Sequence, residues 1–218
     1  MQCTSVLAPR AMRVIRRSEF DTRPWRNGGG VTHEAVRVPA GREDFWWRIS
    51  VAEIAESGPF SDFTGYRRHL ALLDGPGCDL RFANGERREL RRRGDLIDFD
   101  GALAAECTLI GGPCMDLNLL TARATVDADA RVASLGVPRP LDRVPNATIA
   151  VFCVAGRIRI ECDMAETQVV TTGDLALLDG AAGTRLVDAD PGDPAALAFI
   201  ATITERLPKG HEGDEHDR

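Results

Sequence analysis

The sequence lacks the features that identify membrane-embedded and secreted proteins. No apolar run approaches the roughly 20 residues that a membrane-spanning helix requires. Arginines interrupt the first 17 residues, so the continuous hydrophobic segment of a secretory signal does not form there. These absences argue against a membrane span and a secretory signal, and we expect a cytoplasmic protein.

Patterns for disulfide, nucleophilic and nucleotide chemistry are missing as well. The six cysteines form no C-x-x-C pair and most lie in apolar, strand-like runs, which predicts small buried thiols. Ser50 and Ser61 lack a G-x-S-x-G context, and the glycine-rich stretch lacks the G-x-G-x-x-G spacing. We therefore assign no catalytic residue.

The charge of the chain argues against a nucleic-acid binder. The formal net charge is -6 and the sequence pI is about 5.3, whereas such proteins carry a basic face. The arginine-rich run from Arg87 to Arg93 is diluted by acidic neighbours. We interpret it as a solvated strand edge or hairpin.

What the sequence does contain is short apolar segments separated by many turn residues. Its 218 residues are 44% hydrophobic, with 21 glycines and 12 prolines, which fits a turn-dense β architecture. Long helical periodicity is missing, and Thr125–Leu135 is the one modest helical candidate. Residues 121–146 are poor in strand signal and are expected to bridge two halves.

An internal repeat divides the chain. Residues 94–101 and 173–180 both read G-D-L-x-x-x-D-G, 79 residues apart, and the same offset relates Gly77 to Gly156 in hairpin-like turns. A hairpin, then Gly-Asp, a strand and an Asp-Gly turn is typical of a cupin jelly roll.

The repeat predicts an all-β bicupin, that is, two tandem jelly-roll β-barrels. Residues 13–122 form the first barrel with the candidate ligand site, residues 123–207 the linker and second barrel, and residues 208–218 a disordered tail. A pair of unrelated β-sandwiches is the structural alternative.

Two stretches of the first half carry unusual polar groups. In the strand-like run Phe45–Ala52, alternation places Arg48 and Ser50 on the face opposite Trp47, so they face solvent or line a polar cavity. Pro24–Thr32 contains three consecutive glycines before a β-branched pair. It is either a shaped loop whose backbone N–H groups serve recognition or a tight turn.

Four ordered blocks resemble the HutD/Ves family: Trp25–Thr32, Trp47–Ala52, Gly58–Arg68 and Gly111–Asn118. The resemblance implies a bicupin associated with bacterial histidine utilisation. It further implies a small-molecule-binding or regulatory component, with urocanate or formylglutamate-like metabolites as ligands.

A metal centre is not expected. Metal-binding cupins bring two histidines one residue apart to a carboxylate and a third histidine, and this sequence has no H-x-H. His33 and His69 would need a third metal ligand, and no residue spacing in the sequence indicates one. We therefore expect surface or packing roles for both. We assign no metal and no other cofactor.

The remaining polar set is suited to a small anion. Arg48 and Arg68 each offer paired donors to a carboxylate. The predicted ligand-binding residues are Asn27, Gly29, Gly30, Thr32, Arg48, Ser50, Ser61 and Arg68. For each of them a structural hydrogen bond or ion pair is the alternative.

We thus expect a metal-free bicupin that binds a small anionic carboxylate metabolite in an accessory or regulatory role. An enzyme acting on such metabolites and a protein-interaction module are the alternatives. Neither a nucleic acid nor a membrane is expected as a partner, and a homodimer is left open.

Overall fold

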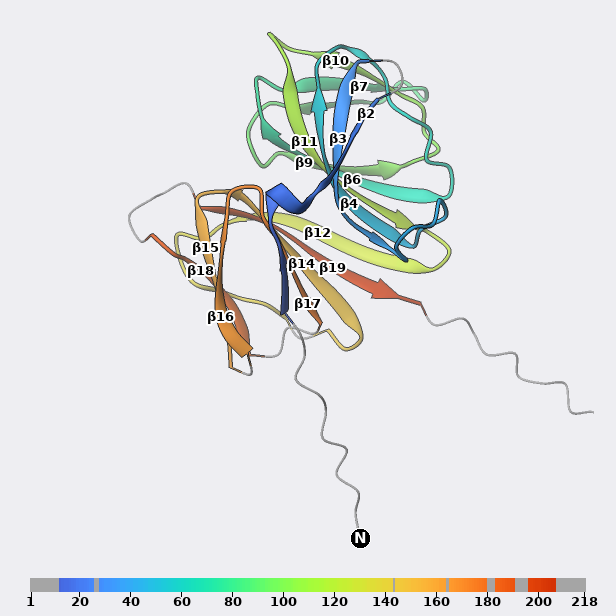
Figure 1. Cartoon of the computed structure of the whole chain (residues 1–218). Helices are drawn as coiled ribbons and strands as arrows, with labels where there is room; N and C mark the ends of the chain where they lie inside the picture. The colour runs from blue at the N-terminus through green and yellow to red at the C-terminus, as the bar shows by residue number, and fades with distance from the viewer. Residues whose placement is uncertain are drawn as a thin grey trace, which may run out of the picture.

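The computed structural model describes residues 12–25, 28–142, 144–163, 165–179, 183–190 and 196–206. Within these ranges the chain is built from strands, and the only helix is the single 3-10 turn η1 (Arg17–Glu19). No helix in the described part is long and apolar enough to cross a membrane. Figure 1 shows the strands gathered into two adjoining β units.

The first barrel combines two antiparallel sheets. One has six strands, in the order β2 (Asp21–Pro24), β3 (Gly30–Val38), β4 (Trp47–Ile54), β11 (Cys114–Ala122), β6 (Tyr66–Asp74) and β9 (Leu96–Asp100). The other has four, in the order β5 (Gly58–Pro59), β10 (Ala105–Leu109), β7 (Cys78–Phe82) and β8 (Arg87–Leu90). The arginine-rich run thus begins in an edge strand, β8, which confirms its predicted place in a hairpin.

The second barrel repeats this plan. Its five-stranded sheet runs β1 (Met12–Ile15), β17 (Leu175–Asp179), β14 (Ala147–Ala155), β19 (Leu197–Glu205) and β12 (Val126–Ser134). Its four-stranded sheet runs β13 (Arg139–Pro140), β18 (Thr184–Asp188), β15 (Arg157–Cys162) and β16 (Ala165–Thr171). The predicted first barrel starts at residue 13, within β1, and β1 pairs with β17 of the second barrel.

The helical interpretation of Thr125–Leu135 was wrong. This segment contains β12, which pairs with β19 along its whole length, and β13 follows before residue 146. Val126 is buried, and Ala128, Ala130 and Val132 pack on the same apolar cluster, so the true period is two. Alanine and aspartate have weak strand propensity, which hid this alternation.

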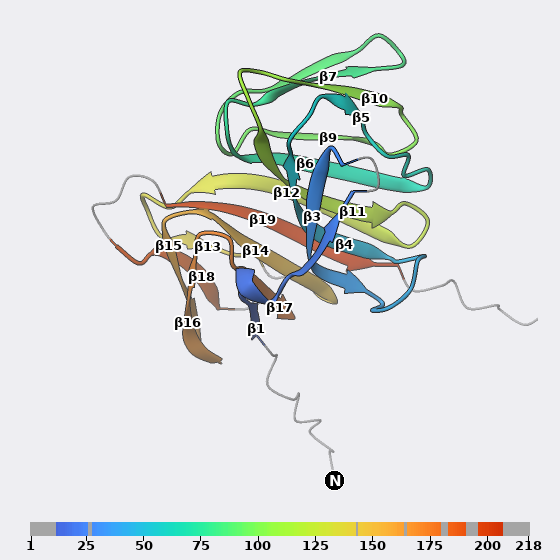
Figure 2. The ribbon, with the colours of Figure 1, turned by 45° about the horizontal axis from the view of Figure 1, so that its top comes forward.

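The two barrels share a continuous apolar core. One cluster joins Trp47, Ile49 and Val51 of the first barrel to Phe152 and Phe199 of the second. In Figure 2, β12, β19 and β14 lie against the six-stranded sheet, where this cluster is sandwiched. A second cluster fills the interior of the second barrel, and a third fills one end of the first.

The sequence repeat corresponds to one repeated turn. Gly94 and Gly173 adopt φ +90° and +92°, which is why glycine stands there. Gly94 N–H donates to Leu72 O at 2.8 Å, and Gly173 N–H donates to Cys153 O at 2.8 Å. The strands that follow are β9 and β17, which pair in matching register with β6 and β14, so the predicted repeat is confirmed.

Candidate functional site

A cavity of about 480 Å³ opens into the first barrel. Its wall brings together five of the predicted residues, which come from four separate segments: Thr32, Arg48, Ser50, Ser61 and Arg68. The other lining residues are Asp21, Arg23, Pro24, Trp25, Glu34, Arg37, Ala52, Pro59, Phe60, Phe63 and Asn118. This size is typical of a small-molecule site.

Strand β4 supplies the floor of the cavity through its alternation. Trp47, Ile49 and Val51 point into the core between the barrels. Arg48 and Ser50 therefore point the other way, and both line the cavity. Of the two interpretations of this strand face, solvent and polar cavity, the structure supports the cavity, while Trp47 lies in the core and is 3% exposed.

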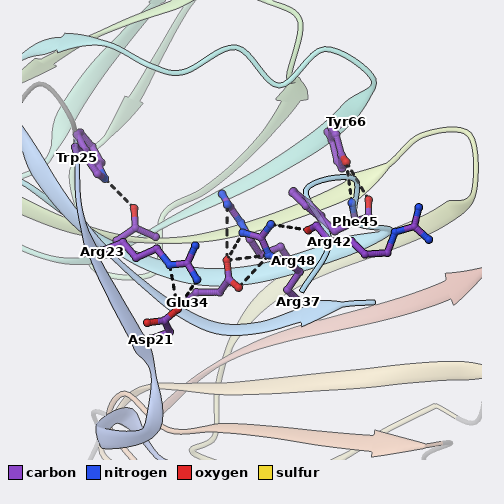
Figure 3. Close-up of polar contacts among 10 residues, drawn as sticks. Asp21, Arg23, Trp25, Glu34, Arg37, Arg42, Phe45, Arg48 and Tyr66 are labelled. Carbon is purple, nitrogen blue, oxygen red and sulfur yellow. Dashed lines mark hydrogen bonds and ion pairs between the residues drawn. The ribbon is translucent and has the colours of Figure 1, made fainter. Parts of the chain in front are cut away.

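Arg48 is partly buried beside a carboxylate that already has another partner. Glu34 accepts from Arg37 Nε at 3.0 Å and from a terminal nitrogen of Arg37 at 2.6 Å. The Arg48 guanidinium lies 3.9 Å from the same carboxylate, and its buried Nε has no hydrogen-bond partner among the described residues. Figure 3 shows Glu34 between the two arginines. Burial lowers the pKa of Arg48, and Glu34 opposes that effect.

Arg68 is held by an amide and by aromatic rings. Its Nε donates to Asn118 Oδ1 at 2.7 Å, and its guanidinium lies 4.3 Å from the Phe60 ring centroid. The side chain is 8% exposed, and burial lowers its pKa to about 10, so it stays charged at neutral pH. Arg48 is similarly placed 5.3 Å from the Phe63 ring centroid. Stacking on the ring face leaves the N–H edge of a guanidinium free to donate.

The cavity wall carries an excess of positive charge. Arg23 donates to Asp21 at 2.6 Å, and Arg37 donates to Glu34 at 2.6 Å. These two pairs neutralise the two lining carboxylates. The positive charges of Arg48 and Arg68 are in excess of these pairs. Arg48 is 3.9 Å from the shared Glu34, and Arg68 makes no ion pair with any described carboxylate.

The glycine stretch shapes the rim of the cavity. Trp25 lines the cavity and donates from Nε1 to Thr32 Oγ1 at 2.8 Å. Gly30 is buried in β3, and Gly29 accepts backbone hydrogen bonds from Ala55 and Glu56. Neither glycine lines the main cavity, although Gly29 lines a smaller pocket of about 90 Å³ next to Phe60. The predicted Asn27 lies outside the described residues.

The sequence interpretation missed part of the wall. Glu34 and Arg37 are three residues apart on β3 and meet because a register shift between Glu34 and Val36 interrupts the regular alternation. Regular alternation would have put them on opposite faces, so no local signal marks the pair. Phe60 and Phe63 lie in the segment before β6, and their rings support the two arginines.

The described histidines and cysteines form no reactive cluster. His33 bonds to Thr22 and Glu53, each at 2.8 Å. His69 is 5% exposed beside a separate cleft of about 730 Å³ between the barrels, and burial lowers its pKa to about 4. Cys78, Cys107, Cys114 and Cys153 are buried free thiols, as predicted. Among the described residues no three His, Cys, Asp or Glu side chains are grouped so as to hold a metal.

The fold and the cavity define a bicupin with a positively charged pocket in its first barrel. Its fold is also that of Bacillus subtilis oxalate decarboxylase, with a TM-score of 0.62 at 10% identity over 88% of this chain and 76% of that one. The HutD family model matches residues 17–195, so the chain belongs to the HutD family, whose members are associated with histidine utilisation. This confirms the predicted fold and the resemblance.

Individual relatives agree. The chain is 30% identical over 177 residues to the uncharacterized 21.2 kDa protein in the hutC 3' region of Pseudomonas putida, covering 78% of this chain and 87% of that protein. It is 40% identical over 110 residues to protein Ves of Citrobacter koseri, 50% of this chain and 57% of Ves. The structure of HutD from Pseudomonas fluorescens SBW25, in a formate condition, has a TM-score of 0.73 at 30% identity, over 90% of this chain and 100% of that one.

Proposed function

We propose that the first barrel binds a small carboxylate metabolite between Arg48 and Arg68 and serves an accessory role in histidine utilisation. One observation carries the proposal: the buried guanidinium of Arg68 and the partly buried guanidinium of Arg48 face one cavity, and the two carboxylates that line it are engaged by other arginines. A buried charge without a partner is unfavourable, so an entering anion would supply the missing counter-charge.

The chemistry of the wall favours a carboxylate. A guanidinium donates two parallel N–H groups to the two oxygens of a carboxylate, and the unpartnered Nε of Arg48 is available for such a pair. Ser50 and Ser61 line the same cavity and offer hydroxyl donors. Phe60, Phe63 and Trp25 provide apolar surface for the rest of a metabolite.

We place the protein in the cytoplasm. Five described cysteines are free thiols, and four of them are buried, as suits a reducing compartment. The family takes its name from histidine utilisation. Carboxylate intermediates of that process are therefore the ligands to test.

Calorimetric titration with formate, urocanate and N-formylglutamate tests the proposal. Formate is the simplest probe, because it presents the carboxylate alone. We expect saturable binding of at least one of the three. Absence of heat and of any thermal shift at millimolar concentration of all three would overturn the carboxylate assignment.

Substitutions locate the site. Arg48→Ala is expected to weaken binding at least ~10-fold, the loss typical of a charge-assisted bond worth 1.5–3 kcal/mol, and Arg48→Lys should recover only part of it. Arg185→Ala is the matched control, because Arg185 is an exposed arginine of the second barrel paired with Glu161. Full binding by Arg48→Ala would show that the ligand sits elsewhere.

A further inference from the structure

A buried polar chain runs from the cavity into the first barrel. Arg68 Nε donates to Asn118 Oδ1 at 2.7 Å, and the Asn118 amide nitrogen donates in turn to Asp116 Oδ1. Asp116 is 2% exposed and Asn118 is 4% exposed. The second oxygen of Asp116 is buried and has no hydrogen-bond partner in the described part of the chain. Asn118 therefore links a cavity arginine to a carboxyl group behind it.

The second barrel shows that the fold does not require this chain. In the first barrel Asn118 pairs with Leu70 and Asp116 with Leu72, and Arg68 lies opposite Phe99. The matching register in the second barrel places Ile149, Ile200 and Ala198 at the positions of Arg68, Asn118 and Asp116. All three belong to its apolar interior. Since an apolar interior completes the same barrel, the polar chain serves the cavity.

Asp116 is the group of this interior that titrates near neutrality. Burial raises its pKa to about 7, against the opposing effects of Arg68 and Asn118. The other titratable neighbours are the thiols of Cys78, Cys107 and Cys114 from β7, β10 and β11. A hydrogen bond with Cys107 and burial raise the pKa of Cys78 to about 12, so that thiol stays neutral. Arg48 lies farther off and acts on Arg68.

We propose that anion binding in the cavity is coupled to proton uptake by Asp116. This inference rests on the proposed function of the same cavity. The bound carboxylate and an ionised Asp116 compete for the positive charge of Arg68, so each disfavours the other. The anion is therefore bound together with one proton, which a buffer acid gives up and a carboxyl oxygen of Asp116 receives as a new O–H bond. The site thus favours carboxylates under mildly acidic conditions.

Proton counting on the unmodified protein is the primary test. Formate is the probe, because it stays ionised across the range and releases no proton of its own. Calorimetric titrations at one pH near 7.5, in two buffers with different ionisation enthalpies, report the protons taken up per formate. We expect uptake, and an affinity that falls ~5-fold or more between pH 6 and pH 8.5, as coupled sites typically show.

The variant Asp116→Asn fixes this position in a neutral form. It is expected to bind formate without proton uptake and with an affinity nearly independent of pH. Asp142→Asn, at an exposed position outside the first barrel, should retain the wild-type coupling. Formate binding by the wild type without proton uptake would overturn the inference and leave the proposed function standing. If formate does not bind, the proton count is made with N-formylglutamate instead. Absence of binding by formate, urocanate and N-formylglutamate alike would contradict the proposed site itself, and this inference with it.

Discussion

Gly30 and Trp25 are in contact at the rim of the cavity, and the contact leaves no room for a side chain on the glycine. A Cβ added to Gly30 would lie 3.0 Å from two carbons of the Trp25 ring and would overlap the carbonyl oxygen of Glu53. The backbone N–H of Trp25 donates to Gly30 O at 2.9 Å, so the two residues are also joined through the backbone. Glycine is thus required at position 30 for close packing.

Gly30→Ala is expected to destabilise the protein by about 1–3 kcal/mol, the usual cost of overpacking, because the Glu53 backbone cannot yield freely. The displaced Trp25 should also weaken formate binding. Gly28→Ala is the matched control: Gly28 has φ +76° but open space around it. Gly28→Ala should lower the free energy of unfolding by about 1 kcal/mol, because alanine disfavours a positive φ. The affinity for formate should not change. Urea unfolding and calorimetry measure both, and equal effects of the two variants on binding would contradict the packing argument.

The hydrogen bond from Trp25 Nε1 to Thr32 Oγ1 gives a second prediction. The bond is 2.8 Å long and partly buried, so it should contribute about 1 kcal/mol to stability. A double-mutant cycle of Trp25→Phe and Thr32→Val, followed by urea unfolding, isolates this pairwise term. Additive effects of the two substitutions would mean that the bond contributes nothing.

The parts of this fold that the sequence predicted are those dictated by local chemistry. The repeated Gly-Asp turn needs a glycine with positive φ and an aspartate that accepts backbone N–H groups, so the octet marks both barrels. The alternation of β4 is local as well, and it suffices to predict that Arg48 and Ser50 share one face.

The parts that the sequence did not predict depend on distant or irregular pairing. β1 joins β17 across more than 150 residues, and such a pairing leaves no local pattern. The Arg37–Glu34 pair depends on a register shift in β3. The alternation of β11 does predict that Asp116 and Asn118 share one face, suited to orienting an arginine or closing the barrel end. That the arginine is Arg68 depends on β6 and β11 being neighbours in the sheet, which no local pattern reveals.

Asp174 gives a third prediction, because it fastens the start of the chain to the second barrel. Its side chain accepts from Arg17 N–H at 3.0 Å, from Arg16 at 2.8 Å, and from the Thr171 N–H and hydroxyl at 3.0 Å each. Burial opposes ionisation, but these donors outweigh it and lower the pKa of Asp174. Asp174→Asn should lower the free energy of unfolding by about 1–3 kcal/mol at pH 7, since a buried acceptor is replaced by a donor.

The pH dependence checks the cause. A carboxylate with a depressed pKa stabilises the fold above its unfolded pKa of about 3.9, and this contribution is lost as pH falls through the folded pKa. The difference between wild type and Asp174→Asn should therefore shrink below about pH 4. Asp95→Asn is the matched comparison at the repeated turn of the first barrel, where the side chain accepts, from described residues, only the Arg91 and Arg92 N–H groups. A larger loss from Asp95→Asn than from Asp174→Asn would contradict the anchoring role.

Asp116 leads to a prediction of the opposite sign, which concerns stability without any ligand. Burial raises its pKa to about 7 in the folded chain, whereas an unfolded aspartate titrates near about 3.9. Between these two values the folded state holds a proton that the unfolded state has released. Rising pH therefore lowers the free energy of unfolding of the wild type across this window, until both states are ionised. Asp116→Asn lacks this titration. Between pH 4 and pH 8 its free energy of unfolding should rise relative to that of the wild type, by about a few kcal/mol in total.

Urea unfolding of both proteins at pH 5, 6, 7 and 8 measures this gain. His69 also affects the wild-type curve, because burial lowers its pKa to about 4 in the folded protein. As pH falls, the unfolded state takes up a proton on this histidine before the folded state does, so the free energy of unfolding decreases. That contribution is the same in both proteins and cancels in the difference. The gain should therefore grow steadily from pH 5 to pH 7 and then level off. A constant difference would mean that Asp116 is already ionised at pH 5, and that the polar chain behind Arg68 carries a permanent charge.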